Sequence, residues 1–200
     1  MSGPLPIVYL ARHAETAWSL SGQHTGLTDL PIIERGEASA RLLGERLQRL
    51  KVDRVFTSPL QRATRTCELA GFKEVAEVDP DLVEWDYGAY EGLRTADIRA
   101  EIPDWQLFRD GCPRGESPEQ VWQRADRVVN RIRAIEGTVL LFSSGHFLRM
   151  LVARWLELRP IDGRLFALST ASLSAMGYEH DLSHPVIQYW NDTHHLGSGS

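Results

Sequence analysis

The sequence predicts an α/β sandwich, because short apolar runs alternate along the chain with segments of helical periodicity. Apolar runs occur at 7–11 and 138–142, and a third short strand is expected within 53–59. Each run has the length of a buried strand and leads into polar residues that precede a helix signal. Alternating strand and helix units of this kind are typical of a sheet covered by helices.

The first half of the chain is expected to hold two helices. Residues 14–33, which follow the first strand, are rich in Gly, Ser and Thr and indicate a loop. Leucines at helical spacing predict the first helix at 34–50. The second helix is expected to reach Ala70, with Ser58 as its N-cap and Pro59 at its first helical position.

The second half begins with a long irregular stretch and then becomes regular again. Ser117 opens a capping box, and it precedes a helix with one continuous apolar stripe. Another helix is expected directly after His146. The remaining elements are an edge strand at 75–78, short helices at 95–100 and 103–110, and an antiparallel strand pair at 171–178 and 186–190 near the sheet edge.

Composition is that of an ordinary globular domain. The chain has 200 residues, of which 42% are hydrophobic and 24% charged, and its net charge is −5. We therefore expect one domain over 1–195 with a flexible tail at 196–200, and neither a nucleic acid nor a membrane as partner. Two cysteines, and the lack of a signal-peptide pattern, predict a cytoplasmic protein. The oligomeric state stays open.

Basic side chains follow three predicted strands at the points where those strands end. Arg12 and His13 come directly after the first strand, Arg62 lies on the first turn of the helix that follows the second, and His146 opens the helix after the third. Open α/β sheets bind ligands at the carboxyl ends of their strands. Arginine suits phosphate recognition and histidine suits nucleophilic attack. The pattern therefore predicts a phosphoryl-transfer site.

These motifs, in this order, make the chain resemble the histidine phosphatase superfamily in its phosphoglycerate-mutase-like branch. The shared stretches are RHAET at 12–16, TSPLQRA at 57–63, LVEWDYG at 82–88, GES at 115–117 and SGH at 144–146. The loop GQHTGLTDLPI at 22–32 is similar to that of the family's sugar bisphosphatases, such as sedoheptulose bisphosphatase. The resemblance implies a three-layer sandwich with a mostly parallel central sheet. Ala14 stands where the family usually has Gly, and Ser19 where many members have Asn.

The resemblance also implies a mechanism. His13 would be the nucleophile, Arg12, Arg62 and His146 would hold the phosphoryl oxygens, and Glu84 would exchange the proton. No metal or cofactor is expected, because these cations supply the positive charge. Additional contacts to a small phosphorylated substrate are expected from Ser19, Gln23, Thr25, Gly26 and Phe147.

Position along the chain alone leaves several assignments open. Asp86, Glu91 and Glu116 are acids near Glu84 in sequence and compete for the proton-transfer role. The roles of His24 and Trp85, in the pocket or in the core, also stay open. Histidines at 180, 184, 194 and 195 fit no metal-binding spacing, so we expect them to be solvated.

Three functions fit the motifs. The first is a metal-independent phosphatase for small metabolites, namely sugar phosphates or bisphosphates. The second is a phosphoglycerate mutase, although the dedicated mutases that this chain resembles are usually longer, with inserted lid segments. The third is a non-catalytic phosphate-binding protein. The complete set of motifs argues against this third function. We expect the phosphatase.

Overall fold

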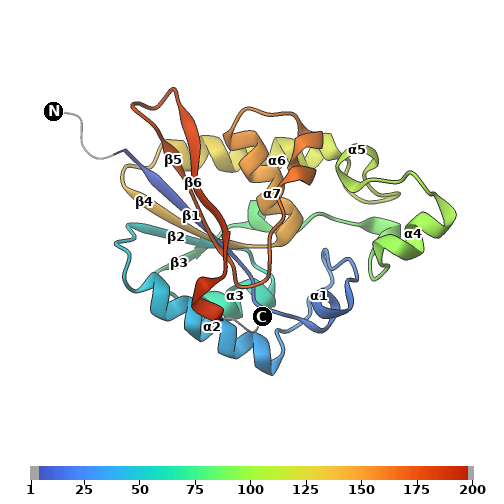
Figure 1. The fold of residues 1–200 in the computed structure, drawn as a ribbon, viewed down its shortest axis with the longest axis horizontal. Coiled ribbons are helices and arrows are strands. Elements are labelled where there is room, and N and C mark those ends of the chain that lie inside the picture. Colours follow the sequence, from blue (N-terminus) through green and yellow to red (C-terminus); the bar gives the residue numbers. More distant parts are fainter. Residues whose placement is uncertain (1–4, 198–200) are drawn as a thin grey trace.

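The computed structural model describes residues 5–197 and contains one six-stranded sheet, with the strand order β3-β2-β4-β1-β5-β6 (Figure 1). The strands are β1 (Ile7–Arg12), β2 (Arg54–Thr57), β3 (Ala76–Val78), β4 (Thr138–Ser143), β5 (Leu173–Tyr178) and β6 (Pro185–Asp192). Strands β1 to β4 run parallel, whereas β5 and β6 are antiparallel to their neighbours. The predicted mostly parallel sheet, with β3 and β6 at its edges, is confirmed.

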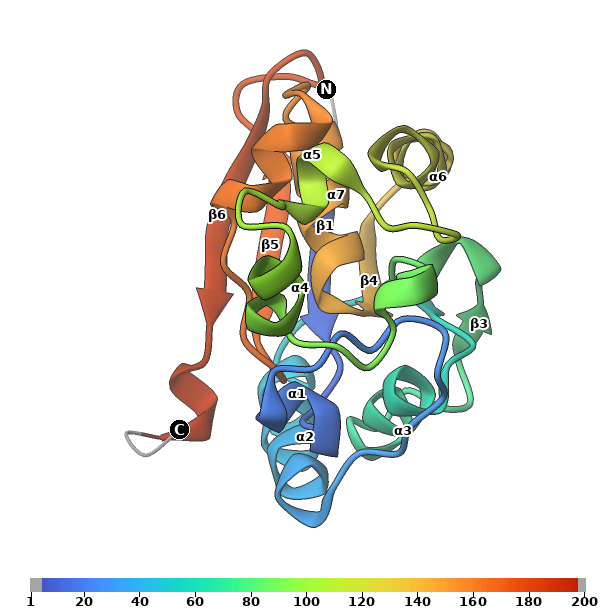
Figure 2. The same ribbon diagram turned by 90° about the vertical axis from the view of Figure 1, so that its right-hand side faces the viewer.

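Helices cover both faces of this sheet. On one face lie α6 (Pro118–Arg133) and α7 (Gly145–Trp155), and on the other lie α2 (Glu34–Leu47) and α3 (Gln61–Leu69), as Figures 1 and 2 show. Side chains along β1 point to both faces of the sheet. Val8 and Leu10 pack on the α6–α7 side, and Ala11 packs on the α2–α3 side. The predicted three-layer α/β sandwich is confirmed.

Short elements gather at the end of the sheet toward which β1 runs. They are α1 (Ala17–Ser21), α4 (Thr95–Glu101), α5 (Leu107–Asp110) and the 3₁₀ helices η1 (Pro80–Leu82), η2 (Gly88–Tyr90), η3 (Pro160–Leu165) and η4 (His194–Leu196). Figure 2 looks onto this end, with α1 and α4 in front of β1. The connections that follow β1, β2 and β4 therefore open toward a common region.

The expectation that 14–33 is all loop was wrong. Thr16 and Ser19 form a capping box, in which each side chain accepts a hydrogen bond from the other residue's backbone N–H, at 3.1 and 2.9 Å. This box starts the short helix α1, and Gly22 ends it in the left-handed conformation at φ 78°. A Ser at the fourth position of a capping box is a weaker signal than Glu or Gln, so the pattern was not recognised.

The predicted N-cap of α3 was also wrong. The helix begins at Gln61, and Ser58 lies three residues before it. A distant residue caps the helix instead, since Asp29 accepts a hydrogen bond from the Gln61 backbone N–H at 2.8 Å. The prediction for Ser117 was correct, because its side chain accepts a hydrogen bond from Gln120 N at the start of α6.

Smaller differences concern helix ends. The helix predicted at 34–50 ends at Leu47, and the one predicted at 103–110 covers only Leu107–Asp110. Of the tail predicted at 196–200, residues 198–200 lie outside the described residues. Between residues 5 and 197, no helix has both the length and the apolar character needed to cross a membrane.

Candidate active site

His13 lies just beyond the last residue of β1, and it is 3% exposed. Its backbone N–H donates to Ser143 O of the neighbouring strand at 2.9 Å, which holds the residue at the carboxyl end of the sheet. Its ring atom Nδ1 lies 2.7 Å from Ala14 O. A carbonyl oxygen can only accept, so Nδ1 carries the proton and Nε2 keeps its lone pair.

The protonation of His13 follows from its surroundings. Burial, together with the positive charges of Arg12 and Arg62, holds the pKa of His13 well below its ordinary value of 6.5. The ring is therefore neutral at physiological pH. A buried neutral imidazole with a free Nε2 lone pair can act as a nucleophile.

Arg12 and Arg62 carry positive charge beside His13, and the carboxylate of Glu84 favours the charged form of both without pairing directly with either. Among the residues that the structure describes, neither arginine has an acidic oxygen within 4.0 Å. The Nε atoms of both are buried without a hydrogen-bond partner. Gly145 leaves space for the Arg12 side chain, because a Cβ at position 145 would lie 3.1 Å from Arg12 Cζ. Buried charges are normally paired, so this arrangement is suited to an anionic ligand.

Arg62 also organises the loop that follows α1. Its side chain is fully buried, and it donates to the carbonyl oxygens of Thr25, Gly26 and Thr28 at 3.1, 2.6 and 3.0 Å. Glycine is required at position 26, because a Cβ there would come within 2.5 Å of Trp85 O. The loop conformation and the arginine position therefore depend on each other.

His146 is the second residue of α7, and its ring is oriented by Tyr87. Tyr87 Oη lies 2.5 Å from His146 Nδ1. Burial raises the pKa of Tyr87 well above 10 and lowers the pKa of His146 well below 6.5, so both groups are neutral. His146 Nδ1 is the one hydrogen-bond partner of this buried phenol within the described chain, so Oη–H donates to Nδ1. His146 Nε2 must then carry a proton and act as a donor.

The two histidines are thus in opposite tautomers. His13 presents a lone pair at Nε2, whereas His146 presents an N–H at the same ring position. One ring is set up to attack and the other to donate a hydrogen bond. Tyr87 was not among the site residues predicted from the sequence, and its place three positions after Glu84 in the LVEWDYG stretch was the available signal.

Glu84 is the acid that adjoins His146. Its Oε2 accepts from His146 N at 2.9 Å, while Oε1 accepts from Phe147 N at 2.7 Å and from Trp85 N at 2.9 Å. The carboxylate therefore binds the N-terminus of α7, where the helix dipole favours negative charge. Oε2 receives one of these three bonds and keeps a lone pair for a further partner.

The three competing acids are engaged elsewhere. Glu116 forms an ion pair with Arg124 at 2.7 Å. Asp86 accepts from Gly88 N at 2.9 Å, and Glu91 accepts from Gly26 N at 2.8 Å. Of the four candidates, Glu84 is the one hydrogen-bonded to the His146 backbone.

The predicted substrate contacts are less well supported than the central residues. Ser19 belongs to the capping box of α1, although it also lines a cavity of about 580 Å³ together with Arg12. Gln23 and Thr25 bond to backbone carbonyls of Gly92 and Gln23, and the Gly26 amide donates to Glu91. The Phe147 side chain is fully buried in the core, so only its backbone reaches the site.

The structure gives different positions to Trp85 and His24, the two residues whose roles the sequence left open. Trp85 is fully buried and packs edge-on against Phe108, whereas His24 lies 4.7 Å from the Tyr87 ring and 5.9 Å from the His146 ring. Burial lowers the pKa of His24 to about 4. Ala14, which replaces the usual glycine, fits because its methyl group packs in a small apolar cluster. Within residues 5–197, no group of three or more His, Cys, Asp or Glu side chains is arranged to hold a metal ion.

Comparison with known proteins agrees with this geometry. Residues 8–193 match the model of the histidine phosphatase superfamily, branch 1. The chain belongs to the histidine phosphatase superfamily. An acid phosphatase of Mycobacterium tuberculosis is 45% identical over 177 residues, which cover 86% of each chain. A sedoheptulose 1,7-bisphosphatase of Saccharomyces cerevisiae is 37% identical over 187 residues, which cover 76% of this chain and 68% of the yeast protein.

A solved structure supports the same conclusion about the fold. The product of an open reading frame of Mycobacterium tuberculosis superposes with a TM-score of 0.88 at 41% identity. The superposition covers 92% of this chain and 96% of that one. The predicted family, the phosphoglycerate-mutase-like fold and the enzyme class of histidine phosphatase are confirmed.

Proposed function

We propose that this histidine phosphatase is a metal-independent phosphomonoesterase that acts on small phosphorylated metabolites through a phosphohistidine at His13. The observation that carries the proposal is the pair of arginines, Arg12 and Arg62, which lie beside a neutral histidine with their Nε–H groups buried and without a hydrogen-bond acceptor in the described residues. A phosphoryl group supplies the missing negative charge, and the arginine fork matches its oxygens.

In the first step, His13 Nε2 attacks the phosphorus atom in line with the leaving oxygen. A P–N bond forms as the P–O bond to the alcohol breaks. Arg12 and Arg62 stabilise the charge on the equatorial oxygens, and His146 donates through Nε2–H. Tyr87 acts as a positioning residue, because it selects the His146 tautomer that can donate.

Glu84 handles the proton in both steps. A sugar alkoxide is a poor leaving group, so Glu84 takes up a proton from solvent when the substrate binds and donates it to the departing oxygen. In the second step the resulting carboxylate accepts a proton from water, which attacks phosphorus and breaks the P–N bond. The products are the alcohol, inorganic phosphate and regenerated neutral His13.

Sugar phosphates or bisphosphates are the substrate class that we propose. The named activities of the relatives, acid phosphatase and sedoheptulose 1,7-bisphosphatase, support hydrolysis of phosphate esters. A phosphoglycerate mutase would need the same His13 chemistry but would have to keep water away from the phosphohistidine.

Rapid quench with a ³²P-labelled sugar phosphate tests the mechanism. Label should appear on His13 as an acid-labile, base-stable adduct, and inorganic phosphate should be released in the presence of EDTA. His13→Ala should abolish both while the protein stays folded. Label on a serine or an aspartate would refute the mechanism. Fast isomerisation of phosphoglycerates with negligible phosphate release would favour the mutase, and no turnover of any ester would favour a binding protein.

A further inference from the structure

A cavity of about 300 Å³ adjoins the candidate active site at His146. Three arginines from separate elements line it, namely Arg99 of α4, Arg149 of α7 and Arg164 of η3. His24, Trp105 and Phe108 form further parts of its wall. The volume is at the lower end of the range for small-molecule sites, so it suits part of a small metabolite.

The charge of this cavity is not balanced by its own walls. It contains no acidic side chain, and within the described part of the chain none of the three arginines has an ion pair within 4.0 Å. Four other cavities differ in this respect, since acidic residues line each of them: Asp126 and Glu157; Glu45 and Asp192; Glu37 and Glu68; and Glu15.

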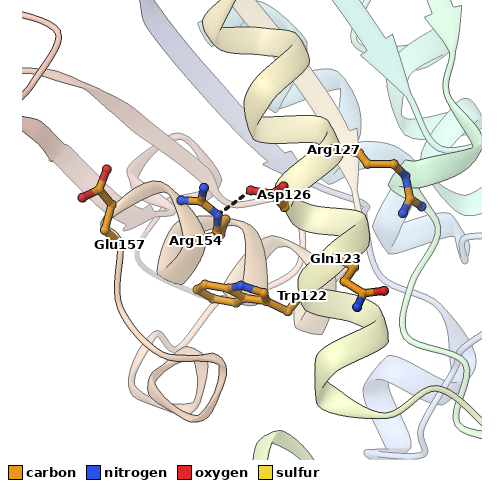
Figure 3. Close-up of a pocket in the computed structure, with 6 residues that line it drawn as sticks. All are labelled: Trp122, Gln123, Asp126, Arg127, Arg154 and Glu157. Atoms are coloured by element: carbon orange, nitrogen blue, oxygen red, sulfur yellow. Dashed lines mark hydrogen bonds and ion pairs between the residues drawn. The ribbon is translucent and has the colours of Figure 1, made fainter.

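One of these four illustrates the contrast. Figure 3 shows a cavity of about 680 Å³ between α6 and α7, in which Arg154 donates to Asp126 at 2.7 Å. Arg127, on the same helix as Asp126, pairs with Asp81 at 2.6 Å. These arginines are neutralised by the protein, so that cavity needs no anion.

Two of the arginines in this cavity have N–H groups without an acceptor in the described structure. Arg149 donates through Nε to Gly163 O at 3.2 Å and through Nη2 to Arg164 O at 2.9 Å, while its guanidinium lies 4.8 Å from the centre of the Phe108 ring. Arg99 donates through Nε to Trp105 O at 3.0 Å. These bonds fix one edge of each guanidinium and leave Nη1 of Arg149 and both Nη atoms of Arg99 without an acceptor in residues 5–197.

The cavity is close enough to His146 for one molecule to occupy both places. Arg149 follows His146 by three residues on α7, so the two side chains lie on the same face about 5–6 Å apart at Cβ. The Phe108 ring packs edge-on against His146 at 5.6 Å and also stacks with Arg149. A group held by Arg149 therefore lies beside the phosphoryl group that His146 would contact.

We propose that this cavity is a subsite for a second anionic group of the substrate, which Arg99, Arg149 and Arg164 bind at the end remote from the scissile phosphate. The inference rests on the proposed phosphatase function and narrows it. The enzyme selects small metabolites with two anionic groups, such as sugar bisphosphates or phosphorylated acids, over neutral sugars with a single phosphate.

Paired substrates test this subsite. The wild type is assayed with fructose 1,6-bisphosphate, fructose 1-phosphate, 3-phosphoglycerate and 4-nitrophenyl phosphate at low ionic strength. We expect kcat/KM for a substrate with a second anion to exceed that for fructose 1-phosphate by about tenfold or more, mainly through KM. The ratio of these two kcat/KM values should fall about tenfold in Arg149→Gln and in Arg164→Gln. Arg164 is exposed, so its variant tests the subsite even if Arg149→Gln does not fold.

Arg127→Gln is the matched control, because it removes an arginine from the cavity of Figure 3 and should leave the ratio unchanged. A wild-type ratio near one, or a ratio unaffected by Arg149→Gln and Arg164→Gln, refutes the subsite while the phosphatase function stands. Calorimetric binding of the same substrates separates the two proposals. If no ester is hydrolysed, the phosphatase function fails, and equal binding of bisphosphate and monophosphate then refutes the subsite as well. Tighter bisphosphate binding that Arg164→Gln weakens supports it.

Discussion

Glu84 is expected to serve both stability and catalysis, and Glu84→Gln separates the two roles. Its carboxylate accepts three backbone hydrogen bonds, from Trp85, His146 and Phe147. The amide oxygen of glutamine can take the place of Oε1 and keep two of them. The amide NH₂ then faces His146 N–H, which is left without its acceptor.

The loss of stability in Glu84→Gln follows from this geometry. One hydrogen bond to a charged group is lost, which costs about 1.5–3 kcal/mol. Loss of the negative charge at the N-terminus of α7 costs about 0.3–1 kcal/mol more. We therefore expect Glu84→Gln to lower the free energy of unfolding by about 2–4 kcal/mol. For a chain of 200 residues each kcal/mol lowers Tm by roughly 2–4 °C, which differential scanning calorimetry resolves.

The catalytic effect is measured at 25 °C on folded protein with two substrates. A sugar phosphate needs a proton on its leaving oxygen, so its kcat should fall about 10²–10⁴-fold. The aryl oxygen of 4-nitrophenyl phosphate leaves without that proton, so its loss should be smaller than about tenfold.

Glu119→Gln is the control for the helix-dipole contribution. Glu119 is an exposed acid in the first turn of α6 and makes no hydrogen bond to that helix's backbone in the described structure, so this variant should change Tm little and activity not at all. An unchanged Tm for Glu84→Gln would contradict the three-bond geometry. Equal losses for both substrates would show that Glu84 is not the proton donor.

Three further predictions concern other parts of the site. Arg62→Ala should reduce kcat/KM about 10³-fold. Arg62→Lys should not restore it, because an ammonium cannot reach three loop carbonyls at once as the guanidinium does. Full recovery of kcat/KM in Arg62→Lys would contradict this prediction. Tyr87→Phe should lower kcat with little change in KM and shift the ¹⁵N NMR signals of His146 toward a tautomer mixture, whereas unchanged signals would show that Tyr87 does not select the tautomer. Stability should fall below pH 6.5, because His13, His24 and His146 stay neutral in the folded state while their unfolded counterparts bind protons. Between pH 7 and pH 5 this amounts to about 2 kcal/mol for each histidine, so urea unfolding that is unchanged between these two pH values would disprove it.

Most of the sheet and the central part of the candidate site could be predicted from the sequence. Apolar runs and capping signals depend on neighbouring residues, which is why β1, β4 and the Ser117 cap of α6 were correct. The carboxyl ends of parallel strands meet at one edge, so the convergence of His13, Arg62 and His146 also followed from local patterns.

Contacts between distant loops could not be predicted in this way. Asp29 caps α3 from 32 residues away, which displaced the expected cap at Ser58. Tyr87 and His146, which share a hydrogen bond, are 59 residues apart. Neither contact leaves a periodic signal in the sequence, because each depends on how irregular segments fold against the sheet.

The sequence by itself determined the α/β architecture, the family and the order of the motifs that form the candidate site, because strand and helix periodicity and short motifs are properties of adjacent residues. Only the tertiary structure decided that Glu84 rather than its neighbouring acids meets His146, that Tyr87 orients that ring, and that three arginines from α4, α7 and η3 share one cavity. The physical reason is that these side chains are brought together by long connections. Their conformations depend on packing and hydrogen bonds across the whole domain.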